Sequence, residues 1–568
     1  MAGSDVQWGT AQARWILLAT ILGSSIALLD ATLVNVALPT FSDDLDAPLS
    51  VLQWTVNAYT LTLASFILVG GSLGDRVGRR RIFLIGIAWF AVASLLCGLS
   101  QDIWQLVAAR ALQGIGGALL TPGSLALIQA SFVPADRARA IGTWAGLGGV
   151  ATLIGPFLGG YLIDTATWRW IFLINVPLAA LALWVGHKHV PESRDELSAG
   201  HFDWLGAVFA VLTLGAGTYA LIYAAGDLIR PDVLVAALLA LAGGIGFLVS
   251  QRREAHPMVP LGIFSSRQFS AANGMTFLVY GALSAVFFIL VLQLQVVSGF
   301  SATAAGLAMI PVTVLMMLFS TRAGAFAGRI GPRVPMTVGP LVCAVGTLLF
   351  LRAGPAANYL TDVLPGALVF GLGLTTLVAP LTATVLAAAD DRYAGVASGV
   401  NNAVARAAGL LAVAGLPLLV GLSSESGLEP VGLDAAYTRA MIGNAVLLAA
   451  GGILSWFTIR TPLPTATTDA QPDAGWPPDE ARRAEPAGAV RSVAEPGTDR
   501  LPCVPCVPAR NRSCWAGQVT ACRLTRRSAA TPSRRTSARR SARCAGMRPG
   551  RAPRPRLHLR RPYARVRD

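Results

Sequence analysis

The amino-acid sequence predicts an all-α protein whose helices cross a membrane many times, and three observations predict it. Hydrophobic residues make up 54% of the 568 residues and charged residues only 13%, a balance typical of membrane proteins rather than of soluble domains. Apolar runs of about 18–27 residues recur up to residue 460, and a helix of roughly 20 residues crosses the hydrocarbon core of a bilayer. The loops between these runs are alternately basic and acidic, as expected of loops on opposite sides of a membrane.

We expect fourteen spans, with both termini in the cytoplasm. Arginine gathers in every second loop, as at Arg79 and Arg80, whereas the loops between carry mainly acids such as Asp43 and Asp44. Because basic loops stay on the cytoplasmic side, this alternation predicts a multi-pass protein of the cell (inner, cytoplasmic) membrane. The predicted spans are 15–38, 52–72, 82–100, 104–128, 138–163, 169–186, 203–224, 231–250, 269–293, 304–327, 335–353, 361–388, 395–420 and 437–459.

A weak internal repeat predicts two parallel halves. Residues 71–80 (GSLGDRVGRR) realign with residues 324–333 (GAFAGRIGPR) at an offset of 253. This offset corresponds to six spans plus two extra ones, and parallel repeats are a common plan of secondary transporters. We therefore expect a cytoplasmic N-terminus at 1–14, a six-helix half at 15–186, two extra central helices with their linkers at 187–268, and a second six-helix half at 269–460.

The remaining residues, 461–568, form a basic tail without apolar periodicity. They hold 22 of the 45 lysines and arginines but only 8 of the 30 acids, and so contribute +14 of the net charge of +15. We expect this tail to be disordered, and its arginine-rich composition favours a frameshifted or non-native end. A lipid-contacting polybasic tail and a nucleic-acid-binding tail are the alternatives; we expect no nucleic-acid partner for the chain.

Two opposite charges lie inside predicted spans. Asp30 lies about 12 Å from the outer end of the first span at Leu38, and Arg110 lies roughly 9 Å from the outer end of the fourth. A charge at such depth is costly unless it is paired or faces a water-filled cavity. We therefore expect Asp30 and Arg110 to neutralise one another. A purely structural ion pair is the alternative, as is a shorter first span with Asp30 at its outer end.

The loop after the second span carries a more specific pattern, GSLGDRVGRRR at residues 71–81. Its glycines allow a tight turn and close approach of other backbone. The series resembles the signature between helices 2 and 3 of the major facilitator superfamily of secondary transporters. The resemblance implies a latch for the cytoplasmic gate, built from Gly71, Gly74, Asp75, Arg76, Gly78, Arg79 and Arg80.

Further stretches resemble the fourteen-helix drug:proton antiporter branch of this superfamily. They are LDATLVNVALP at 29–39, RALQGIGG at 110–117, GPFLGG at 155–160 and WRWIFLINVPLA at 168–179. The resemblance implies that Asp30 and Arg110 couple transport to protons. It also implies an antiporter motif, typical of exporters, at Gly155, Pro156, Gly159 and Gly160.

Glycine pairs in the fifth span predict close helix packing. The pair at 142 and 146 and the pair at 155 and 159 each place small residues four apart, which lets another helix approach closely. Pro156 frees a backbone carbonyl and allows a bend.

The expected function is proton-coupled export of small amphipathic drugs or antibiotics, and the alternative is export of one endogenous metabolite. A membrane-bound sensor or enzyme is the alternative of another class. Against it, no histidine lies in a predicted span, and Lys188, the single lysine, does not follow the glycine-rich turn of a phosphate-binding loop. We expect no covalent catalysis, no cofactor and no metal. The proton gradient supplies the energy, and the partners are the substrate, protons and the lipid bilayer.

Polar and aromatic residues within the spans are candidates for a substrate cavity, although each also suits an interhelical hydrogen bond or an aromatic belt. Apart from Asp362 at a margin, the spans of the second half contain no acid. We therefore expect neutral or weakly anionic compounds to be exported better than quaternary cations, because a desolvated cation needs a partner. The candidates are Asn35, Trp54, Asn57, Tyr59, Gln113, Tyr280, Gln293, Gln295 and Arg406.

Overall fold

The computed structural model describes residues 6–194, 203–254, 257–388, 394–422 and 428–460 of the chain. In these residues the only β-pairing is an isolated bridge between Val6 and Phe132, and the rest of the regular structure is helical. Among the described residues, fourteen helical segments are long and apolar enough to cross a membrane, and each overlaps one predicted span. The predicted tail at 461–568 lies outside the described residues.

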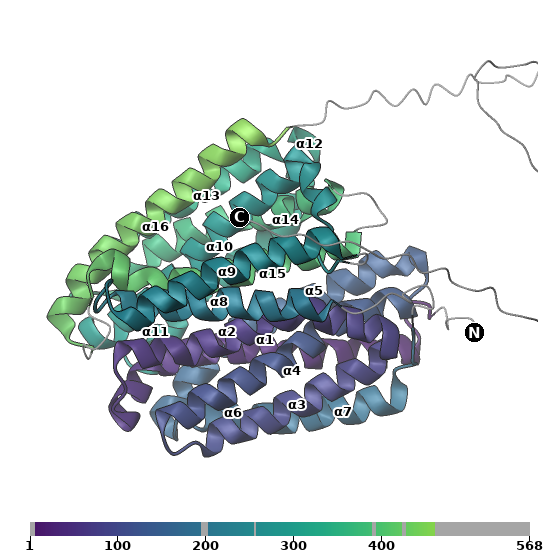
Figure 1. Cartoon of the computed structure of the whole chain (residues 1–568), viewed down its shortest axis with the longest axis horizontal. Helices are drawn as coiled ribbons and strands as arrows, with labels where there is room; N and C mark the ends of the chain where they lie inside the picture. The colour runs from purple at the N-terminus through teal and green to yellow at the C-terminus, as the bar shows by residue number, and fades with distance from the viewer. Residues whose placement is uncertain (1–5, 195–202, 255–256, 389–393, 423–427, 461–568) are drawn as a thin grey trace, which may run out of the picture. The chain divides into compact units, whose positions relative to one another are not determined.

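The helices fall into a first group, a central pair and a second group along the chain (Figure 1). The first group comprises α1 (Ala11–Leu45), α2 (Leu49–Val77), α3 (Arg79–Leu99), α4 (Ile103–Ser131), α5 (Pro134–Thr165), α6 (Trp170–Leu173) and α7 (Asn175–His189). The central pair is α8 (Trp204–Ala224) and α9 (Pro231–Arg253). The second group comprises α10 (Arg267–Leu292), α11 (Ala302–Ala308), α12 (Ile310–Ile330), α13 (Arg333–Leu349), α14 (Leu364–Ala387), α15 (Ala394–Val420) and α16 (Pro430–Thr458). The short turns η1 (Leu261–Ser265), η2 (Gln293–Val297), η3 (Phe350–Arg352) and η4 (Tyr359–Val363) flank helices of the second group.

The first helix is longer than the sequence predicts. It continues through Pro39 to Leu45, whereas we expected it to end at Leu38. Asp30 therefore lies farther from the end of α1 than expected, and the alternative of a shorter first span with Asp30 at its outer end is wrong. A proline removes one intrahelical hydrogen bond without ending a helix when neighbouring helices hold the chain in place.

The two groups repeat one another in their packing. In the first group α2 and α3 pack on α4, and α1 packs on α5 and α7. In the second group α12 and α13 pack on α14, and α10 packs on α15 and α16. The aligned turns also match, because Gly78 and Gly331 both have positive φ, at 128° and 83°, a conformation that glycine adopts without steric cost. The structure thus supports the internal repeat.

The central pair lies along the seam between the two groups. Helix α8 packs on α9 and also on both α2 and α15 (Figure 1). Only 22% of the most apolar window of α8 and 17% of that of α9 is buried. These apolar surfaces suit contact with lipid, so α8 and α9 cover one side of the seam without entering the core of either group.

The two groups are joined at the end of the bundle opposite the Gly78 turn; we call the Gly78 end the arginine end. Gln53, in the first turns of α2, donates from its side-chain amide to the carbonyls of Val413 and Ala414 in α15. Pro417 lies four residues after Val413 and has no N–H with which to pair that carbonyl. Gln53 therefore satisfies an acceptor that the proline leaves open.

Two more hydrogen bonds cross between the groups at this opposite end. Gln295, in the π-helical turn η2, donates to the carbonyl of Val36 in α1 at 2.9 Å. The backbone N–H of Thr303 donates to the Asp164 carboxylate, also at 2.9 Å. Helix α5 packs directly on α11 here. In this conformation the opposite end is closed by side chain to backbone contacts.

Candidate functional site

A buried ion pair forms the centre of the candidate site. Asp30 of α1 and Arg110 of α4 are 0% and 1% exposed, and the Arg110 Nη1 group donates to Asp30 Oδ2. The predicted contact between the two charges is confirmed. Because an unpaired buried charge is strongly unfavourable, each residue compensates for the other.

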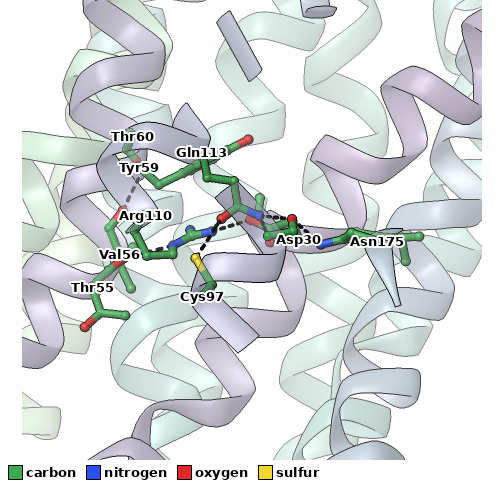
Figure 2. Close-up of polar contacts among 12 residues, drawn as sticks. Asp30, Thr55, Val56, Tyr59, Thr60, Cys97, Arg110, Gln113 and Asn175 are labelled. Atoms are coloured by element: carbon green, nitrogen blue, oxygen red, sulfur yellow. Dashed lines mark hydrogen bonds and ion pairs between the residues drawn. The ribbon is translucent and has the colours of Figure 1, made fainter. Parts of the chain in front are cut away.

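The Asp30 carboxylate accepts hydrogen bonds from two more side chains (Figure 2). Gln113 lies one helical turn after Arg110, and its Nε2 donates to Asp30 Oδ1 at 2.8 Å. Asn175, at the start of α7, donates to the same oxygen at 3.3 Å. Ser94 of α3 accepts from both amides, at 2.7 Å from Gln113 and 3.4 Å from Asn175.

The guanidinium of Arg110 has further partners. Its Nε donates to the carbonyl of Thr55 in α2 at 3.2 Å, and its Nη1 donates to Gln113 Oε1 at 2.5 Å. Its central carbon lies 4.4 Å from the centre of the Tyr59 ring, within the range of a cation–π interaction. We refer to Asp30, Arg110, Gln113, Ser94 and Asn175 as the charge network.

The opposite charges of the network compensate one another. The oxygens of the Asp30 carboxylate are satisfied by Arg110, Gln113 and Asn175. Loss of either partner of the ion pair would leave an unpaired buried charge, which is strongly unfavourable.

A cavity of about 480 Å³ lies between the two helix groups. The first group contributes residues of α1, α2 and α5, and the second contributes residues of α10, α11, α12, α14 and α15. Its walls combine aromatic side chains such as Phe287 and Phe288 with many amides and hydroxyls. This is a suitable place for a small amphipathic molecule. Four of the predicted cavity residues line it, namely Asn35, Asn57, Tyr280 and Arg406.

The other five predicted residues do not line this cavity. Tyr59 and Gln113 contact Arg110, and Gln295 holds the Val36 carbonyl. Gln293 is fully buried and donates to Asp434 at 2.6 Å. Trp54 lies close to Tyr223 in α8. Polarity identified these residues in the sequence, but the rotation of each helix decides which way a side chain points.

The cavity and the charge network share two helices. On α1, Asp30 belongs to the network and the next residue, Ala31, lines the cavity. On α2, Thr55 offers its carbonyl to Arg110, and the next residue, Val56, lines the cavity. A movement of α1 or α2 therefore affects both places.

The turn at the arginine end is held by contacts within the first group. Asp75 pairs with Arg79 at 2.8 Å, and Arg80 donates to the carbonyl of Val190 at 3.1 Å. Glu192, which sequence reasoning missed, accepts from the backbone N–H groups of Arg80 at 3.0 Å and Arg81 at 3.2 Å. A carboxylate at this position stabilises the N-terminus of α3. The predicted gating role of this turn stays a prediction.

The predicted antiporter motif lies where α5 approaches the neighbouring helices most closely. A Cβ added to Gly159 would meet Leu33 of α1, and one added to Gly160 would meet the backbone of Ala302 and Thr303. The expected packing at Gly155 and Gly159 is confirmed. The same expectation for Gly142 and Gly146 is wrong in this conformation, because nothing lies within 4 Å of a Cβ at either position.

Sequence reasoning also missed Ser94 and Asn175. Each is a polar residue inside an otherwise apolar run, and Asn175 also lies in the stretch at 168–179 that resembles the antiporter branch. Within the described residues, no group of three or more His, Cys, Asp or Glu side chains is arranged to hold a metal ion.

Comparison with known proteins adds the following. Residues 20–413 match the family model described as the Major Facilitator Superfamily. The chain is 35% identical over 413 residues to the tetracenomycin C resistance and export protein of Streptomyces glaucescens, covering 71% of this chain and 75% of that one. It is 34% identical over 443 residues to the methylenomycin A resistance protein of Bacillus subtilis (strain 168), covering 77% and 94%. It is 35% identical over 391 residues to the multidrug resistance protein Stp of Mycobacterium tuberculosis (strain ATCC 25618 / H37Rv), covering 68% and 72%.

Two solved structures show the same fold. A POT family transporter in complex with 5-aminolevulinic acid aligns with a TM-score of 0.61 at 12% identity, covering 81% of this chain and 99% of that one. A bacterial homolog of the human lysosomal transporter Spinster, in an inward-facing conformation, aligns with a TM-score of 0.54 at 16% identity, covering 79% and 97%.

Proposed function

Because the chain belongs to the major facilitator superfamily, we propose that it exports small amphipathic drugs or antibiotics across the cytoplasmic membrane in exchange for protons. It is a multi-pass membrane protein and a transporter, not an enzyme. Several relatives are named for resistance to, or export of, antibiotics, which supports drug efflux. Proton coupling and the choice of membrane are parts of the proposal.

The observation that carries the proposal is the charge network beside the cavity. Asp30 is the only carboxylate in the network, and it is fully buried. Ionisable residues inside a membrane protein are costly, and they commonly belong to proton or substrate pathways. A proton on Asp30 would weaken its hold on α4 and α7, and α1 would then be free to move relative to them.

Exchange follows if the two protonation states favour different conformations. In the conformation described here, the two groups are joined at the end opposite the arginine turn. We place the arginine end in the cytoplasm because its loops are basic. Substrate would then enter the cavity from the cytoplasmic side or the inner leaflet. After the outer end opens, Asp30 would take up a proton from outside, and this protonation would accompany release of the substrate.

The proposal is tested with inside-out membrane vesicles that hold an imposed pH gradient, acid inside. Adding a transported amphipathic antibiotic should dissipate the gradient in vesicles that contain the chain. Asp30→Asn should abolish this drug-dependent proton movement, because the side chain keeps its shape but can no longer exchange a proton.

Asp203→Asn is the matched control. Asp203 is also a buried carboxylate, 4% exposed, but it caps α8 at Gly206 and lies outside the charge network. We expect this variant to keep drug-dependent proton movement. Unchanged proton movement in Asp30→Asn, at equal amounts of protein in the membrane, would remove Asp30 from the mechanism.

A further inference from the structure

One wall of the cavity carries a buried amide without partners. Asn57 of α2 is 1% exposed, and neither its Oδ1 nor its Nδ2 makes a hydrogen bond. It lines the cavity next to Val56 and Thr60. A buried amide that bonds nothing is unfavourable and therefore unusual. The cavity wall thus holds an unused hydrogen-bond acceptor and an unused donor.

Helix α15, which packs directly on α2, contributes a cation without a partner to the cavity wall. Arg406 of α15 is the only charged side chain among the described residues that line the cavity. The structure gives it no hydrogen bond and no ion pair with any described residue. Asn402, Arg406 and Gly409 recur at helical spacing along the lining, so this face of α15 is turned toward the cavity.

Other polar side chains of the lining are used within the protein. Asn35, Thr60 and Asn402 each donate to a carbonyl of their own helix. Asn401 donates to Asn273 at 3.2 Å and to Thr276 at 2.8 Å. Arg406 also differs from Arg110, whose guanidinium donates to several partners. Asn57 and Arg406 therefore have no structural contact that explains their polarity.

We propose that Asn57 and Arg406 form a two-point recognition site for aromatic substrates that carry an acidic oxygen and, apart from it, a carbonyl or hydroxyl group. Arg406 binds the acidic oxygen of a carboxylate, phenolate or enolate, because a guanidinium offers paired donors and a permanent charge. Asn57 bonds the second oxygen. This rests on the proposed function and adds the chemical class of the substrate.

The rest of the lining fits this class. Tyr280, Phe287 and Phe288 supply aromatic surface for a flat ring system. No described acid lines the cavity, and Asp30 is already held by Arg110. A permanent cation would thus lose its water without gaining a partner, whereas an anion gains Arg406.

The test measures binding of three probes to the full chain in proteoliposomes. The probes are anthraquinone-2-carboxylate, anthraquinone-2-carboxamide, which lacks the charge, and anthracene-2-carboxylate, which lacks the quinone carbonyls. The unmodified chain should bind the first probe at least about tenfold more tightly than either of the others.

The variants separate the two contacts. Arg406→Gln should abolish the preference for the carboxylate over the carboxamide, and Arg406→Lys should retain most of it. Asn57→Ala should abolish the preference for anthraquinone over anthracene and leave the preference for carboxylate intact. These are changes in discrimination, which a general loss of folding or packing does not produce.

Two control variants address indirect effects. Arg322→Gln removes an exposed arginine of α12 that bonds its own helix and lies outside the lining. Asn444→Ala removes a buried amide of α16 that also has an unpaired Nδ2 but lies away from the cavity. Both should keep the full probe preferences.

The possible outcomes are distinct. Equal binding of carboxylate and carboxamide by the unmodified chain, or equal weakening of all three probes in Arg406→Gln, would overturn the two-point site. If the probe preferences hold but no compound is exchanged for protons, the proposed function fails and the recognition site stands. If proton-driven export of neutral compounds holds without any probe preference, the recognition site fails alone.

Discussion

At the scale of the residue, Arg110 is the member of the charge network with the most demanding geometry. It donates to Asp30, Gln113 and the Thr55 carbonyl, and it also lies over the Tyr59 ring. One side chain thus serves acceptors on three other residues and the face of a ring. Only a guanidinium has donors spread over several nitrogens of a planar group, whereas an ammonium group is a compact charge with three donors at one atom.

Arg110→Lys should therefore lose export although it preserves the charge. The lysine ammonium can neutralise Asp30, but it cannot also reach the Thr55 carbonyl and stack on Tyr59. We expect drug-dependent proton movement to fall at least about tenfold, as for loss of a bidentate contact. The measurement is the vesicle assay at matched protein levels.

Arg352→Lys provides the control for this exchange. Arg352 is exposed and lies 3.8 Å from Asp362, and exposed ion pairs contribute little. It should transport normally. Normal transport by Arg110→Lys would show that charge alone matters and that the guanidinium geometry does not.

At the scale of the element, helix α5 differs between its two ends. Toward its end at Thr165, Gly160 lies against the backbone of Ala302 and Thr303 in α11. From the side of α11, a Cβ added to Gly306 would meet the backbone of Pro156 in α5. Toward the arginine end, a Cβ on Gly149 would have no other atom within 4 Å. The close approach of α5 to α11 through glycines is thus confined to the half of α5 that ends at Thr165.

Gly160→Val should prevent α5 and α11 from packing together, and so should prevent closure of the end opposite the arginine end. Backbone cannot move aside as a flexible side chain can, so the larger residue forces α5 and α11 apart. Single cysteines at Asp164 and Thr303, which are hydrogen-bonded in the structure at 2.9 Å, report the closure by disulfide cross-linking. We expect the cross-link to form in the parent double-cysteine chain and to be lost when Gly160→Val is added.

Gly149→Val in the same double-cysteine background is the control, because a Cβ at this position meets nothing in this conformation. It should leave the cross-link intact. Cross-linking that persists in Gly160→Val would mean that α5 and α11 tolerate the extra volume, and the closure would then not depend on the glycine.

At the scale of the whole molecule, the described residues that form the charge network and the cavity all lie before residue 460. The two helix groups contact each other directly through α1, α2, α5, α10, α11 and α15, and α8 spans the seam between α2 and α15. Transport by relative movement of the groups requires these helices. We therefore expect transport to proceed without the basic tail.

A chain that ends at Pro464 should insert and export as well as the full chain. The removed residues hold nearly all of the net positive charge, and both sites are built from described residues that precede them. The comparison is drug-dependent proton movement per amount of protein in the membrane. Loss of activity at normal expression would show that the tail has a function of its own.

The sequence by itself determined the number and order of the spans. Crossing hydrocarbon requires about twenty apolar residues with every backbone group paired inside a helix. Apolar runs of this length are easily recognised in the sequence. It also determined that Asp30 and Arg110 should meet, because two opposite charges inside spans have few other partners. The turn at Gly78 was evident for a similar reason, since few residues other than glycine adopt its positive φ.

Only the tertiary structure decided how the polar side chains divide between the two sites. Gln113 and Tyr59 contact Arg110, whereas Asn57, two residues before Tyr59, faces the cavity. Ser94 and Asn175 join the charge network from α3 and α7. The physical reason is that, when a span is apolar on all sides, its sequence does not indicate which face packs on which neighbouring helix. That choice depends on the rotation of each helix about its axis, and the rotation is set by packing between residues distant in the sequence.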